Sequence, residues 1–85
     1  MAIIKVNFRV KWELPVYVRI GYGSREKISG PDEALEYLNH RWPERQSALY
    51  NEAKRCCLAA IRDRGSPIWA RKAFLDAAAT AKMLA

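Results

Sequence analysis

The chain has 85 residues, of which 51% are hydrophobic, and it carries a formal net charge of +6 at neutral pH. This length allows one small domain with a modest core, and an ordinary hydrophobic fraction argues against intrinsic disorder. No apolar run approaches the ~20 residues needed to cross a bilayer, and charged residues interrupt any signal-like segment near the start, so we expect a cytoplasmic protein with no membrane partner.

The first predicted element is a strand at about residues 3–12, where apolar and polar residues alternate without a break from Ile4 onward. Side chains of a strand point alternately to its two faces, so one face of this segment is apolar and the other is basic. The basic face carries Lys5, Arg9 and Lys11. The apolar face needs a cover, which helices later in the chain can provide.

Two further short strands are predicted at about residues 15–21 and 25–29. Gly21-Tyr22-Gly23-Ser24 indicates a turn between them, because glycine tolerates the positive φ that hairpin loops need. Pro15 cannot donate a hydrogen bond to a sheet, so it either ends the preceding strand or kinks it. The sheet is therefore expected to have two or three antiparallel strands.

Three helices are predicted next, at about residues 30–42, 45–64 and 67–83. We expect Ser29 to cap the first helix and Gly65 to lie at the end of the second. The predicted buried faces are Ala34, Leu35, Leu38 and Trp42 on the first helix, Leu49, Ala53, Cys56, Cys57, Ala60 and Ile61 on the second, and Ala70, Ala73, Phe74, Ala77, Ala78 and Ala81 on the third.

These elements define an α+β fold class, with a small antiparallel sheet of two or three strands packed against three helices. The whole of residues 1–85 is expected to form one domain, since no linker, repeat or low-complexity tract interrupts the pattern.

An ordered set of landmarks also resembles a known family. The landmarks are Pro15-Val16 with Val18, Ala34, Leu38, Trp42-Pro43, Tyr50, Ala53, Cys57, Ala70-Arg71, Phe74 and Ala77-Ala78. Together they resemble the small bacterial family catalogued as domain of unknown function 982, over about residues 12–83. Members often carry glycine after the tryptophan-proline loop, where this chain has Gln46-Ser47, which leaves the start of the second helix open. The resemblance implies a compact α+β domain and supplies no known catalytic or binding residues.

The sequence holds no constellation typical of catalysis. Cys57 is the obvious thiol, but the one histidine, His40, belongs to another predicted helix. One histidine and two adjacent cysteines do not make a tetrahedral zinc set. We interpret Cys56 and Cys57 as reduced thiols, and Cys57 as a small buried side chain. The prediction is a protein that is not an enzyme and has no cofactor or metal.

Two residues keep alternative interpretations. Arg71 is flanked by alanines of the predicted buried face, and arginine is rarely buried unless it is paired. It either makes a structural ion pair or hydrogen bond, or it binds an anion or a partner. Trp42 either fills the core where the first helix ends or anchors an interface.

The leading functional hypothesis is a small protein-interaction domain that associates with itself, as a homodimer, because so short a chain leaves apolar surface to cover. The alternative is nucleic-acid binding through the basic strand face, since residues 1–28 hold six basic and two acidic groups, a net charge of +4. Lysine on an exposed strand can equally be a plain solvated face. The candidate interaction residues are Lys5, Arg9, Lys11, Arg19 and Arg71.

Overall fold

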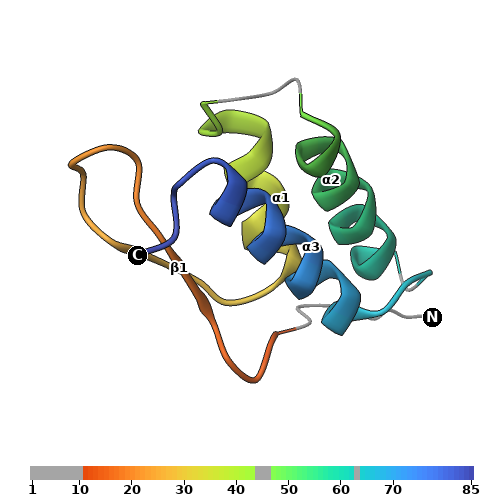
Figure 1. The fold of residues 1–85 in the computed structure, drawn as a ribbon. Coiled ribbons are helices and arrows are strands. Elements are labelled where there is room, and N and C mark those ends of the chain that lie inside the picture. Colours follow the sequence, from red (N-terminus) through yellow and green to blue (C-terminus); the bar gives the residue numbers. More distant parts are fainter. Residues whose placement is uncertain (1–10, 44–46, 63) are drawn as a thin grey trace.

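The structure is a computed structural model that describes residues 11–43, 47–62 and 64–85. Its elements, in chain order, are β1 (Val16–Val18), β2 (Glu26–Ile28), α1 (Pro31–His40), α2 (Ala48–Ile61) and α3 (Pro67–Thr80). The two strands form an antiparallel hairpin that lies beside the three packed helices (Figure 1). This is the predicted α+β architecture, and each element lies within its predicted range but is shorter.

The first predicted strand is not tested over most of its length, because residues 3–10 lie outside the described part of the chain. Its last two residues are described, and neither belongs to a strand. Lys11 is exposed, whereas Trp12 is buried and its backbone N–H donates to the carbonyl of Ser29 at 2.8 Å. Trp12 is therefore held to the end of the hairpin by one backbone hydrogen bond.

The hairpin has a buried and an exposed face. Val16 pairs with Ile28, and these two side chains are buried together with Val18. Because side chains alternate along a strand, Tyr17 and its partner Lys27 lie on the opposite face. In the turn, Gly21 has a φ of 56°, the left-handed conformation for which glycine was expected.

Residues 83–85 complete the sheet on the other edge of β1. The chain leaves α3 through Lys82, whose φ is 60°, and the Met83 N–H donates to the carbonyl of Ala78 at 2.8 Å. This is the geometry of a Schellman motif, here with lysine where glycine is usual. Residues 83–85 then bond to β1 through Arg19 N–H to the Met83 carbonyl and Ala85 N–H to the Tyr17 carbonyl. The third helix thus ends at Thr80 rather than continuing to residue 83.

The capping prediction for the first helix is wrong. Gly30, not Ser29, is the N-cap of α1, and no side chain caps it. Instead the Glu33 carboxylate accepts a hydrogen bond from the Ser29 N–H at 2.8 Å, which satisfies a donor just before the helix. The open start of α2 is resolved by Ser47, whose hydroxyl accepts from the Tyr50 N–H at 3.0 Å.

The predicted buried face of α2 is partly wrong. Leu49 and Ile61 are exposed, whereas Tyr50 is buried. The cause is a specific contact, because the Tyr50 hydroxyl donates to the carbonyl of Leu38 at 3.0 Å and turns this side of α2 toward α1. The helix also ends earlier than predicted, with Arg62 rather than Gly65 as its C-cap.

The centre of the core is an aromatic junction, defined as Tyr37, Trp42, Tyr50 and Phe74. Trp42 is only 3% exposed, and its ring centroid lies 5.5 to 6.3 Å from those of the other three. These rings come from α1, α2 and α3, so Trp42 joins all three helices. The prediction that it fills the core at the end of the first helix is confirmed.

Candidate interaction surfaces

The outer face of the hairpin is basic. Arg19, Arg25 and Lys27 are all exposed there, and the Arg25 guanidinium lies 4.4 Å from the centroid of the Tyr17 ring. None of the three cations forms an ion pair within the described ranges. The neighbouring Glu26 lies on the inner face, where its carboxylate pairs with Arg41. This face therefore presents three unneutralised positive charges and part of an aromatic ring.

The structure places the five predicted interaction residues in different regions. Lys5 and Arg9 lie outside the described residues. Lys11 is exposed, with its Nζ 3.9 Å from a carboxylate oxygen of Glu33. Arg19 lies on the hairpin face, whereas Arg71 lies on α3 and its Nε donates to the carbonyl of Leu14 at 2.7 Å. Lys11 and Arg71 line one pocket, of which Arg19 is not a part.

We call that cavity the Arg71 pocket. Its volume is about 420 Å³, and most of its wall is apolar. Leu14 and Ile68 are 67% and 78% exposed, so both apolar side chains are largely open to solvent. Trp12 is 8% exposed, and its indole N–H has no hydrogen-bond partner among the described residues. The complete lining is Lys11, Trp12, Glu13, Leu14, Pro67, Ile68 and Arg71.

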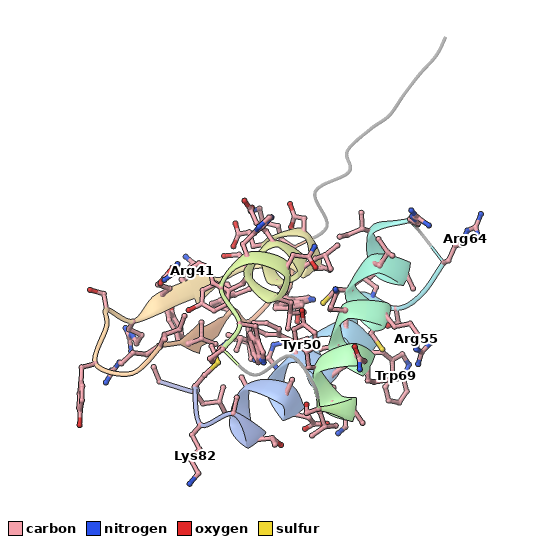
Figure 2. All side chains as sticks on the ribbon, turned by 90° about the horizontal axis from the view of Figure 1, so that it is seen from above. Arg41, Tyr50, Arg55, Arg64, Trp69 and Lys82 are labelled. Atoms are coloured by element: carbon pink, nitrogen blue, oxygen red, sulfur yellow. The ribbon has the colours of Figure 1, made fainter. Side chains whose placement is uncertain are left out.

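A second hollow, the α2–α3 groove, runs between these two helices and measures about 380 Å³. Trp69 lies in it with 65% of its surface exposed. Figure 2 shows the Trp69 side chain of α3 beside the Arg55 side chain of α2. The groove is lined by Leu49, Glu52, Arg55, Cys56, Trp69, Lys72, Ala73 and Asp76.

The charges of this groove are paired along each helix. Arg55 contacts the Glu52 carboxylate at 2.5 Å on α2, and Lys72 contacts the Asp76 carboxylate at 3.2 Å on α3. The hydrogen bond from Arg55 lowers the pKa of the Glu52 carboxyl. Two acids and two bases give the groove no net charge, unlike the basic hairpin face.

The adjacent cysteines have different surroundings. Cys57 is fully buried, and burial raises the pKa of its thiol to about 12. Cys56 is half-buried in the α2–α3 groove, where burial and a hydrogen bond to the Glu52 carboxylate raise the pKa of its thiol. Nucleophilic cysteines need a lowered pKa, so both thiols are in the wrong state for that chemistry at neutral pH.

Neither a metal-binding cluster nor a membrane-spanning helix is found in the part of the chain that the structure describes. No group of three or more His, Cys, Asp or Glu side chains there could hold a metal ion. Among the same residues, no helix has the length and apolar character to span a membrane.

The predicted interaction residues did not include Leu14, Ile68 and Trp69, which are the most exposed apolar residues of the two hollows. A signal was present for two of them. Ser66-Pro67 correctly marked the start of the third helix, and Ile68 and Trp69 follow in its first turn, off the alanine-rich face. A helical projection would have placed both outside the core.

The fold defines a small α+β domain, and comparison with known proteins places it in a family. The family described as "Protein of unknown function (DUF982)" matches residues 14–85, so the chain belongs to this family and the predicted resemblance is confirmed. The NMR structure of Agrobacterium tumefaciens protein Atu1219, a Northeast Structural Genomics Consortium target, is similar to it with a TM-score of 0.74 and 34% sequence identity. The match covers 89% of this chain and 76% of Atu1219. No curated protein sequence matches.

Proposed function

We propose that this chain is a non-enzymatic interaction domain whose partner is a second copy of itself, docked through the α2–α3 groove. The observation that carries the proposal is Trp69, which is 65% exposed within a hollow lined by Leu49 and Ala73. A large aromatic ring in water is unfavourable, and tryptophan is enriched among the residues that dominate the energy of interfaces.

The charge of the groove supports a second copy as the occupant. Two copies that each carry +6 repel each other wherever their basic surfaces meet. The α2–α3 groove has no net charge, so this repulsion is weakest there. A two-fold dimer needs a surface that is complementary to itself, and the pairs Arg55–Glu52 and Lys72–Asp76 can exchange partners across such an axis.

Size-exclusion chromatography with light scattering over a concentration series tests this proposal. The parent protein should pass from a mass of 9.8 kDa toward twice that value at high micromolar concentration. Trp69→Ala should remain monomeric throughout that range. Tyr22→Ala is the matched control, because Tyr22 is a fully exposed aromatic residue in the hairpin turn and does not line the groove. A parent that stays monomeric, or a Tyr22→Ala variant as impaired as Trp69→Ala, would contradict the proposal.

The basic outer face of the hairpin favours a second candidate function, nucleic-acid binding. Arg19, Arg25 and Lys27 project from one exposed face, so they could contact successive phosphates. A two-stranded ribbon is also narrow enough to approach a groove of a duplex. Lys5 and Arg9 of the predicted basic strand lie outside the described residues, so Arg19, Arg25 and Lys27 carry this candidate function.

Fluorescence anisotropy titrations with a labelled duplex at about 50 and 200 mM salt test the second candidate, because phosphate contacts release counterions. Arg19→Ala combined with Lys27→Ala should weaken binding and reduce the salt slope by about 2, since each phosphate contact contributes roughly 0.9. Arg62→Ala combined with Arg64→Ala removes the same charge from exposed positions after α2. Equal weakening in the two double variants, or negligible affinity at low salt, would count against this function.

A further inference from the structure

Arg71 is held at the edge of its pocket by a single anchor. Its Nε donates to the carbonyl of Leu14, which fixes the plane of the guanidinium. The four remaining N–H donors on the terminal nitrogens have no partner among the described residues. A fixed guanidinium fork with free donors fits a carboxylate, which can accept two parallel hydrogen bonds.

The other polar groups of the pocket also favour an anion. Lys11 adds a second positive charge, and its ion pair with Glu33 is long, at 3.9 Å, between two solvent-exposed groups. Such a pair is weak in water and does not neutralise Lys11. Glu13 is the acidic residue of the lining, so the described wall has a net charge of +1.

Trp12 also lines the pocket, but its polar atom is buried. Its indole N–H is buried without a hydrogen-bond partner among the described residues, although buried polar groups in folded proteins are normally satisfied. The indole nitrogen has almost no solvent-exposed surface and the Trp12 ring packs against Phe74, so this donor does not face the open pocket. The groups of the lining that can donate to an anion from solvent are therefore those of Arg71 and Lys11, and the Glu13 carboxylate is an acceptor in the same wall.

The rest of the wall is apolar and open to solvent. Leu14 and Ile68 stand on the two sides of the pocket, one before β1 and one in the first turn of α3, and both are mostly exposed. An apolar ligand that covers them would remove this surface from water. The volume of about 420 Å³ lies within the range of small-molecule sites.

We propose that the Arg71 pocket binds a small ligand with an apolar body and a carboxylate group. The carboxylate pairs with the terminal nitrogens of Arg71, and the apolar body covers Leu14 and Ile68. The proposal goes beyond self-association and does not depend on it, because the pocket and the α2–α3 groove share no residue.

NMR titration of the ¹⁵N-labelled protein tests the proposal, with the Trp12 indole N–H and the Arg71 Nε–H as reporters. Octanoate is the probe, at up to about 10 mM, a range that detects millimolar dissociation constants. We expect saturable shifts of both signals. Octylamine and octanol have the same apolar body without the carboxylate and should bind at least about tenfold more weakly, a loss of about 1.4 kcal/mol. Inorganic phosphate, an anion without an apolar body, should cause no saturable shift of either signal.

Two variants test the charged and the apolar part of the pocket separately, so a folding defect in one leaves the other informative. Arg71→Leu should abolish octanoate binding, and Arg64→Ala, which removes the same charge from an exposed position outside the pocket, should not. Ile68→Asp should also abolish it, and because Ile68 is 78% exposed this change should leave the fold intact. The absence of shifts with octanoate, equal affinity for octylamine, or unchanged affinity in Ile68→Asp would overturn the proposal.

Discussion

Trp42 and Trp69 are both tryptophans near the end of a helix, but Trp42 is buried in the core and Trp69 is exposed. Trp42 follows α1, is 3% exposed and contacts rings from α1, α2 and α3. Trp69 lies in the first turn of α3, is 65% exposed and lines a groove with no net charge. The difference follows from the helix face, since Trp69 is off the α3 face that carries Ala70 and Phe74. Burial at the aromatic junction stabilises the fold, whereas exposure at the groove leaves a ring available to a partner.

The largest effect is expected at the junction. Trp42→Ala should lower the free energy of unfolding by about 3–5 kcal/mol, because it removes a buried ring and leaves a cavity. That is a large share of the stability of so small a domain. Chemical denaturation followed by circular dichroism measures it. A variant as stable as its parent would mean that the junction does not hold the helices together.

A smaller change at the same junction separates packing from hydrogen bonding. Tyr50→Phe keeps the ring against Trp42 but leaves the Leu38 carbonyl without its buried donor. The expected cost is about 1–3 kcal/mol, the penalty for an unsatisfied buried polar group. Denaturation midpoints of this variant and of Tyr17→Phe, a change on the outer hairpin face, provide the comparison. Equal midpoints would show that the hydroxyl of Tyr50 is not a structural donor.

The two cysteines allow the same comparison between a core and a groove position within one helix, because Cys57 faces the core and Cys56 faces the groove. The pKa of the Cys57 thiol is raised to about 12 in the fold from its ordinary value of 9.0. The folded state therefore holds this proton more tightly, so the stabilisation is complete below pH 9 and is lost as the pH rises toward 12. Denaturation of the parent and of Cys57→Ala across this range should show the parent losing more stability. A constant difference between them would contradict the expected pKa.

The smallest change in stability is expected at the groove. Trp69→Ala should alter the free energy of unfolding of the monomer by no more than about 0.5 kcal/mol, because the ring is mostly in solvent. Denaturation at low micromolar concentration, where any dimer is dissociated, measures this. A loss as large as that of Trp42→Ala would show that Trp69 is a core residue, and the contrast between the two tryptophans would fail.

Much of this architecture could be predicted from residue patterns. Alternation identified the two hairpin strands, Ser66-Pro67 identified the start of α3, and the alanine-rich face of that helix is buried as expected for Ala70, Ala77 and Ala78. Such local signals work because helix and strand periodicity is imposed by the backbone itself. The family resemblance was also readable from the order of the landmark residues.

The rest depended on contacts between distant residues. The buried Tyr50 hydroxyl donates a hydrogen bond to the carbonyl of Leu38 on another helix. The pattern of apolar residues in α2 does not predict this hydrogen bond. The Arg71 pocket likewise brings Arg71 to Leu14 across most of the chain. The sequence identified Arg71 as unusual but did not show which backbone group it contacts, nor that Lys11 lines the same pocket.

The pairing of residues 83–85 with β1 has a consequence for the order of folding. A two-stranded hairpin is marginally stable alone, and here its second edge is covered by a segment from the opposite end of the described chain. Contacts between residues so far apart in sequence form late, because closing a long loop costs conformational entropy that only the completed contacts offset. We therefore expect α3 to dock before the sheet is complete. Until then the edge of β1 stays open to pairing with other chains, and residues 83–85 are what protect it once folding ends.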